Sequence, residues 1–316
     1  KDAEKKISNH LENIILLYDS PNIYTIDLSI RRDFDHKIFV KDIYASIILE
    51  ANQLIKNNYI DKKIIHVIST NIIIDGKKLK KDLDKNIKAK SIILEMKFIC
   101  LPSEKFNNIL SVFKKNNLEV LNLFCSSYVK SLSYINFFNE HELLGFIDIG
   151  YEKSTFLLFN ENRLIFIKSI PVGGNHITKD ISKVMRLNIS DSENIKKFFN
   201  RSENEFSHDE NFDENKVLIN EILDKEISVS TLKKVILSRV EEIFDLIFKD
   251  LIILNKSSKN LDFPLILIGS GSKLLDKNIF HLNEEFNFKD IIFYNETDLA
   301  ICEAALYSEL NLEKSD

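Results

Sequence analysis

Hydrophobic and polar positions follow two periods along the chain, and each period predicts a set of elements. Apolar residues at helical spacing predict helices over 1–17, 40–56, 103–117, 126–138, 179–187, 192–197, 232–254 and 298–310. Alternating or unbroken apolar runs bounded by turn residues predict strands over 23–30, 63–75, 91–101, 119–125, 146–149, 154–159, 163–170 and 264–268. This mixture of helices and strands predicts an α/β protein.

The order of these elements also predicts how strands pair. Strand and helix alternate over 91–138, which favours parallel pairing in an α/β layer. Three strands over 146–170 follow one another across short polar turns, which predicts an antiparallel meander. Residues 201–216 are polar and acidic and predict a surface loop, and 217–229 predicts an extended or mixed segment.

Composition places the chain among ordinary globular proteins. It has 316 residues, of which 44% are hydrophobic and 29% charged, enough for two domains or one large composite domain. With 43 basic and 48 acidic residues the net charge is −5, which argues against a general nucleic-acid binder. Only 7 glycines are present, so two glycines close together carry more information than usual.

Cysteine and histidine usage predicts no metal site. Cys100, Cys125 and Cys302 all lie in apolar runs without metal-ligand spacing, which favours buried, reduced thiols. No apolar run approaches the roughly 18 residues of a membrane span, and the first residues lack the apolar core of a signal peptide. The chain begins with Lys1 rather than Met, so we expect residues to precede it.

Two turns could carry chemistry. Asp148-Ile149-Gly150 ends a strand, where a carboxylate can hold Mg²⁺ or its waters and a glycine lets backbone N–H groups approach a phosphate. Gly269-Ser270-Gly271-Ser272 follows a buried strand and permits close approach to a flat or anionic ligand, but it lacks the pattern of a P-loop. Taken singly, each motif is more typical of an ordinary turn.

Two further motifs each allow a structural and a functional interpretation. Gly173-Gly174 lies before a predicted helix. It could form a tight turn or a loop that contacts a ligand. Glu193 and Lys196 are three residues apart and therefore lie on one helix face. They could form an exposed ion pair or a polar pair that binds a nucleoside.

The joint order of these motifs is much more specific than any one of them, and it resembles the second half of the actin-like ATPases. More narrowly, the chain is similar to the bacterial cell division family FtsA. The segments that carry the resemblance are 146–150, 170–181, 192–196, 236–243 and 265–272, with weaker likeness at 65–76 and 140–145.

The resemblance implies a two-lobed, actin-like (ribonuclease H-like) α/β fold with a small inserted α+β domain of SHS2 type. Subdomain 1A would comprise a remnant at 1–19 and the rest at 89–142, and the inserted domain 1C would lie between them at 20–88. Subdomain 2A would comprise 143–180 and 261–316, and subdomain 2B would lie between these pieces at 181–260.

The resemblance also implies an ATP site between the lobes. The residues expected to bind the nucleotide are Asp148, Gly150, Ser154, Gly173, Gly174, Glu193, Lys196, Gly269, Ser270, Gly271 and Ser272. Asp148 is expected to hold Mg²⁺ indirectly, through its waters, and no residue is assigned with certainty as catalytic.

For function, the resemblance implies a division scaffold that binds ATP, self-associates into filaments and tethers FtsZ at the septum. The C-terminal peptide of FtsZ is expected at Lys233, Lys234 and Arg239, and later divisome proteins at the 1C domain. The implied location is cytoplasmic, peripheral on the inner face of the membrane. The anchoring helix is expected beyond residue 316 and the first phosphate hairpin before residue 1.

One departure from the family pattern affects hydrolysis. The family's Asp-Ile-Gly-Gly-Gly-Thr is here Asp148-Ile149-Gly150-Tyr151-Glu152-Lys153. A carboxylate near a triphosphate is repulsive unless Lys153 or Mg²⁺ compensates it, so we expect ATP binding with weak or absent hydrolysis.

Two alternatives remain within the same superfamily. One is a pilus-assembly homologue with a similar inserted domain, which would bind a pilus subunit instead. The other is a sugar or acetate kinase, for which no second acidic motif near Asp148 gives support.

Overall fold

The antiparallel sheet near the N-terminus shows how the sequence pattern becomes a layered structure. The computed structural model describes residues 2–79, 86–138, 140–202, 229–254, 260–274 and 287–313. Four strands pair in the order β2-β5-β3-β4, and β5 (Lys88–Pro102) is antiparallel to both β2 (Tyr24–Phe39) and β3 (Lys62–Ile74). A turn at Asp75 and Gly76 connects β3 to β4 (Lys77–Lys78), with φ values of 46° and 78°. This is the turn that Asp-Gly predicts.

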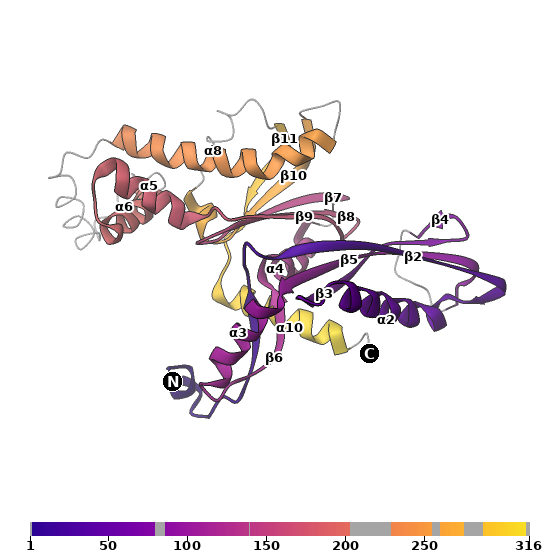
Figure 1. The fold of residues 1–316 in the computed structure, drawn as a ribbon. Helices are drawn as coiled ribbons and strands as arrows, with labels where there is room; N and C mark the ends of the chain where they lie inside the picture. Colours follow the sequence, from indigo (N-terminus) through magenta and orange to yellow (C-terminus); the bar gives the residue numbers. More distant parts are fainter. Residues whose placement is uncertain are drawn as a thin grey trace. The chain divides into compact units, whose positions relative to one another are not determined.

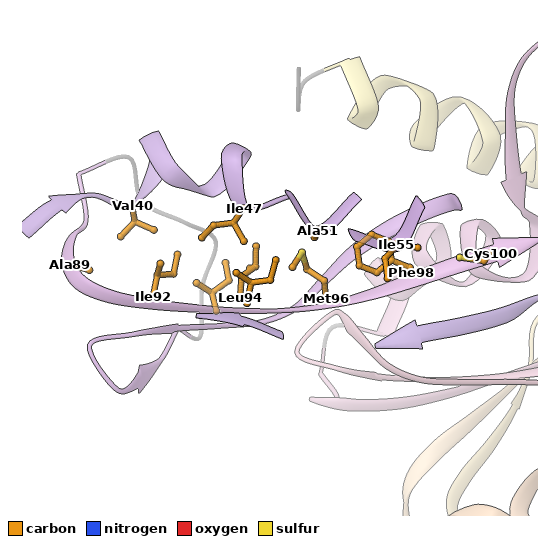
Figure 2. Close-up of a cluster of buried hydrophobic side chains, with 12 residues drawn as sticks. Val40, Ile47, Ala51, Ile55, Ala89, Ile92, Leu94, Met96, Phe98 and Cys100 are labelled. Carbon is orange, nitrogen blue, oxygen red and sulfur yellow. The ribbon is translucent and has the colours of Figure 1, made fainter. Parts of the chain in front are cut away.

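Helix α2 (Val40–Asn58) covers one face of this sheet (Figure 1). Its buried residues are Val40, Ile47, Ala51 and Ile55, which share one helix face. They pack against buried residues of β5 (Figure 2), which alternate from Ile92 onward: Ala89, Ile92, Leu94, Met96, Phe98 and Cys100. The helix predicted over 40–56 is therefore confirmed.

A second, parallel pair of strands lies in the same part of the chain. β1 (Asn13–Tyr18) pairs in parallel with β6 (Glu119–Cys125). After β6, helix α4 (Ser126–Tyr134) begins, and the Asp19 carboxylate accepts a hydrogen bond of 3.1 Å from the Ser127 N–H in its first turn. The His66 ring packs between Phe124 and Tyr128, and its Nε2 accepts a 2.9 Å hydrogen bond from the Cys125 N–H.

Three expectations about these segments are wrong. The helix over 1–17 is confined to α1 (Asp2–Ile7), because the apolar run that begins at Ile14 is a strand paired with β6. The strand over 91–101 does not pair in parallel, since it lies inside the antiparallel sheet. Cys302 is exposed, whereas Cys100 and Cys125 are buried as expected.

The described chain divides into two compact units. One comprises Lys1–Leu143, Leu157–Ile167 and Thr297–Asp316, and the other Leu144–Phe156 and Lys168–Glu296. The first also holds α3 (Ser103–Lys114), the 3-10 helix η1 (Ile135–Phe138) and α10 (Asp298–Glu313). The five subdomain ranges implied by the family resemblance stay a prediction.

The other sheet has the strand order β11-β10-β7-β8-β9. Its strands are β7 (Leu143–Ile149), β8 (Ser154–Asn160), β9 (Arg163–Ile170), β10 (Asn260–Ile268) and β11 (Asn287–Phe293). The three closely spaced strands predicted over 146–170 are confirmed as neighbours, and β10 runs parallel to both β7 and β11. β11 has no counterpart among the predicted strands.

Helices α5 (Gly174–Met185), α6 (Ile189–Ser202) and α8 (Val229–Leu254) belong to the second unit (Figure 1). Phe248 on α8 contacts Phe156 of β8 and Phe288 of β11, with ring centroids 5.1 Å apart in both pairs. Aromatic packing therefore holds α8 on one face of the sheet. The loop predicted over 201–216 and the segment 217–229 lie almost entirely outside the described residues.

Candidate functional site

A tight turn after β7 forms the first part of the candidate site. The Gly150 N–H donates a 2.9 Å hydrogen bond to the Lys153 carbonyl, which closes the turn between β7 and β8. Asp148 is only 5% exposed as a residue, whereas Tyr151 is 58% exposed. Glu152 accepts a 2.6 Å hydrogen bond from the Asn175 side-chain amide, so its carboxylate is tied to the first turn of α5.

The start of α5 is joined directly to this turn. The N–H groups of Gly174 and Asn175 donate to the carbonyls of Gly150 and Tyr151, at 2.9 and 2.7 Å. A methyl group built at Gly173 would lie 2.6 Å from the Gly150 carbonyl oxygen, so only glycine permits this approach. Gly173 and Gly174 thus form both a tight turn and the start of a helix, which begins five residues before the predicted position.

The late glycine bend packs against the end of β7. Gly269 has φ of +85°, and a methyl group built on it would lie 2.3 Å from Asp148 Oδ1. A methyl group at Gly271 would lie 2.4 Å from Ile149 Cγ2. The bend is fixed locally, because the Ser272 hydroxyl donates a 2.7 Å hydrogen bond to the Gly269 carbonyl. Two motifs that are far apart in the sequence therefore meet at the carboxyl ends of β7 and β10.

Lys196 on α6 is the centre of a buried polar cluster. Its ammonium donates to the Gly174 carbonyl, Thr178 Oγ1 and Glu193 Oε2, at 3.0, 2.7 and 2.6 Å. An ammonium group has three N–H donors, so all of them are used within the protein. The Lys196 side chain is 7% exposed and that of Glu193 is 24% exposed, so Glu193 is the more accessible of the two.

The electrostatics of Glu193 follow from the same contacts. Burial raises the pKa of its carboxyl, but the hydrogen bonds from Lys196 and Thr178 and the charges of Lys196 and Lys197 outweigh burial and lower it overall. Glu193 is therefore charged at neutral pH and held by Lys196 and Thr178.

A groove lies between α5 and α8, where the sequence predicts a peptide site. Its volume is about 360 Å³, and Asp180, Val184, Lys234, Val235, Ser238, Arg239 and Glu242 line it. The Arg239 guanidinium donates to both Asp180 carboxylate oxygens, at 2.6 and 3.0 Å, and also pairs with Glu242. The hydrogen bond with Asp180 is the main reason why the pKa of Arg239 is raised. Lys233 and Lys234 are exposed on α8.

Residues 146–284, which include every residue predicted to bind the nucleotide, match the sequence profile of the family described as cell division protein FtsA. Over this segment the chain is similar to FtsA. Cell division protein FtsA of Bacillus subtilis (strain 168) is 25% identical over 218 residues, which are 68% of this chain and 48% of that protein. FtsA of Agrobacterium fabrum is 23% identical over 176 residues, or 55% and 38% of the two chains. The chain thus spans about half the length, or less, of these relatives.

Among solved structures, the PilM–PilN type IV pilus biogenesis complex is similar over 96% of this chain and 82% of that chain, with a TM-score of 0.60. At 12% sequence identity this likeness shows the fold alone. It confirms the predicted actin-like α/β fold.

Most of the predicted site residues meet at the end of β7, and Ser154 and Ser270 do not join them. Those that meet at the end of β7 are Asp148, Gly150, Gly173, Gly174, Gly269 and Gly271. Lys196 joins them through the Gly174 carbonyl and brings Glu193 with it. The Ser154 hydroxyl donates to the Val172 carbonyl at 2.8 Å, and Ser270 is exposed.

Three contributors to this FtsA-like site were not predicted. The Gly269 N–H donates a 2.6 Å hydrogen bond to Glu296 Oε2, from the loop before α10. Asn175 and Thr178 hold Glu152 and Glu193. The position of Asn175 after Gly174 could have indicated a first-turn side chain, but no local pattern marks Glu296.

Two negative findings concern the described part of the chain. None of its helices is long and apolar enough to cross a bilayer. Within the same ranges, no three His, Cys, Asp or Glu side chains are grouped so that they could hold a metal ion.

Proposed function

We propose that the chain is the ATP-binding core of an FtsA-like division scaffold, in which nucleotide favours a self-associating state. One observation carries this proposal: Gly269 and Gly271 pack against Asp148 and Ile149 within the segment that matches FtsA. Glycine-only contacts at the carboxyl ends of neighbouring parallel strands are where open α/β sheets bind ligands. The glycines leave backbone close to the space that the phosphates and the adenosine would occupy.

Within this proposal Glu193 and Lys196 have different roles. Lys196 uses its three donors on Gly174, Thr178 and Glu193, so it positions these groups rather than contacting the nucleotide. Glu193 is partly exposed and charged, and its carboxylate accepts hydrogen bonds from the ribose hydroxyls. Hydrolysis is slow or absent, because Tyr151 and Glu152 stand where the family has glycines and Glu152 is tied to Asn175.

Isothermal titration calorimetry with ATP tests the nucleotide part. We expect saturable binding by the whole chain and at least a tenfold loss of affinity in Glu193→Gln, because the amide loses the charge that holds the hydroxyls. Glu241→Gln, at an exposed position of α8, is the matched control and leaves the affinity unchanged. Absence of any ATP binding, or equal affinity of Glu193→Gln and wild type, would contradict the proposal.

For the partner, we propose that the acidic C-terminal peptide of FtsZ binds along the groove between α5 and α8. Asp180 and Glu242 already compensate Arg239, so we assign the contact with the acidic peptide to Lys234, which lines the groove, and to its exposed neighbour Lys233. The same scaffold would meet later divisome proteins through residues 20–88 and would lie at the inner face of the membrane at the division site.

Fluorescence anisotropy of a labelled FtsZ C-terminal peptide tests this partner. We expect the double variant Lys233→Glu and Lys234→Glu to abolish binding, since it reverses both charges. Lys249→Glu, an exposed lysine near the other end of α8, is the control and retains binding. Unchanged anisotropy with wild-type protein at high micromolar concentration would argue against FtsZ. Pull-down of a pilus subunit instead would support the pilus-assembly alternative.

A further inference from the structure

We propose that the Lys153 ammonium, rather than a magnesium ion, neutralises Asp148, so that this site takes ATP without a divalent cation. The inference rests on the proposed ATP site. It concerns the one position of the hairpin where the family pattern has a threonine and this chain has a lysine.

Lys153 is buried inside the hairpin rather than extended into solvent. Its residue is 6% exposed, and its Nζ lies 2.5 Å from Thr155 Oγ1. Thr155 is completely buried, and its hydroxyl lies 2.9 Å from the Ser169 hydroxyl. The Thr155 and Ser169 hydroxyls therefore form a short hydrogen-bonded chain that ends on the ammonium. A lysine is rarely buried this deeply without such partners.

Lys153 and Asp148 lie on the same face of the sheet. A methyl group built at Gly145 would lie 2.5 Å from the Phe263 ring and 3.1 Å from that of Phe156, so Gly145 and Phe156 share the face that α8 covers. Side chains alternate along a strand, so Asp148 and Thr155 both point to the opposite face. The Lys153 ammonium contacts Thr155 and is therefore on the Asp148 side.

The two cations compete for one small space. Mg²⁺ requires six oxygen ligands at roughly 2.1 Å and keeps several waters, so it needs room beside the carboxylate. Asp148 is 5% exposed, and the Gly269 backbone lies directly against its Oδ1. A buried ammonium on the same face repels a divalent ion and already supplies positive charge, so the residues present do not fit the magnesium site implied by the family.

The neutral threonine of the family pattern cannot supply that charge. Replacement of Lys153 by threonine should leave a buried carboxylate facing the triphosphate, which then needs Mg²⁺ to bind. Lys153 would thus be a specificity-determining residue that decides whether free ATP or its magnesium complex is the ligand.

The test measures ATP affinity by calorimetry in two buffers, one with excess Mg²⁺ and one with EDTA. Wild type is expected to bind with affinities within about twofold of each other, whereas Lys153→Thr should bind at least tenfold more weakly in EDTA than in Mg²⁺. Lys183→Thr, an exposed lysine on α5, is the matched control and should behave as wild type. Lys153→Arg retains the charge and should stay independent of Mg²⁺.

The outcomes separate this inference from the function on which it rests. ATP binding by wild type in Mg²⁺ but not in EDTA overturns the role of Lys153 and leaves the ATP site intact. Binding in neither buffer overturns both. If circular dichroism shows that Lys153→Thr is unfolded, the wild-type and Lys153→Arg measurements decide the matter.

Discussion

Two clusters of this chain, one between α2 and β5 and one between α5 and α6, are built on different physical principles. The cluster between α2 and β5 is apolar, and residues such as Leu94 and Phe98 are completely buried. The cluster between α5 and α6 is polar, and the Lys196 ammonium lies at its centre. Apolar burial is non-directional and scales with area, whereas each contact of the ammonium depends on distance and direction.

The difference teaches where stability and where specificity reside. The apolar cluster holds α2 on the sheet and would do so with many combinations of aliphatic residues. The polar cluster sets the position of Gly174, and hence of the α5 start beside the β7 turn, and admits few substitutions. Loss of one side chain should therefore have different consequences in the two clusters.

The largest expected effect comes from the apolar cluster. Phe98→Ala removes a completely buried ring and should lower the free energy of unfolding by about 3–5 kcal/mol, through lost transfer energy and the cavity left behind. Urea denaturation measures this change. Val112→Ala, at an exposed position of α3, should change the free energy by less than about 0.5 kcal/mol. Equal effects of the two substitutions would mean that the core does not hold this unit.

A smaller effect is expected from the polar cluster. Lys196→Ala removes the ammonium that donates to the Glu193 carboxylate and the Thr178 hydroxyl, leaves Glu193 with the hydrogen bond from Thr178, and should cost about 2 kcal/mol. The figure is below that of a fully buried pair, because Glu193 is partly exposed to water. A double-mutant cycle with Glu193→Gln should show coupling between the two sites, and additive effects would contradict the cluster.

The smallest of the three effects is a pH dependence of stability, which we expect from the buried ring of His66. Burial lowers the pKa of His66 to about 3, so folding favours the neutral ring, whose Nε2 accepts the Cys125 N–H. The unfolded chain takes up a proton below the ordinary pKa of about 6.5, so stability is full above that pH and falls as the pH is lowered towards 3. The free energy of unfolding should drop by about 1 kcal/mol between pH 7 and pH 5.5.

His66→Gln should flatten this pH dependence, because the glutamine oxygen can still accept the hydrogen bond but does not titrate. His36→Gln, at an exposed position of β2, should retain the wild-type slope. Identical slopes in all three proteins would show that His66 is not the titrating group.

The sequence predicted those parts of the fold in which one period dominates. The spacing of Ile47 and Ala51 defined α2, and the seven residues of β6 were predicted without error. The apolar run from Ile14 reads equally as helix or strand, and only its pairing with β6 decides. Strand direction over 91–101 depends on partners far away in the sequence, which local alternation does not contain.

The same limit holds for the candidate site. The order of Asp148, Gly173 and Gly269 in the sequence predicted which backbone segments meet, because glycine spacing records a close approach. It did not predict that Lys196 would use all its donors inside the protein, or that Glu296 would accept the Gly269 N–H. Those contacts depend on tertiary packing of side chains that have no local pattern.

Hydrogen–deuterium exchange of the wild-type chain with and without ATP tests the central claim most directly, because it locates the ligand on the sequence. Saturating ATP should slow amide exchange in three separated segments, 148–154, 173–178 and 269–272, and leave the antiparallel sheet of β2, β3 and β5 unchanged. Exchange that is unchanged in all three segments, or protection confined to the antiparallel sheet, would contradict the claim that ATP binds where the glycine bend meets Asp148.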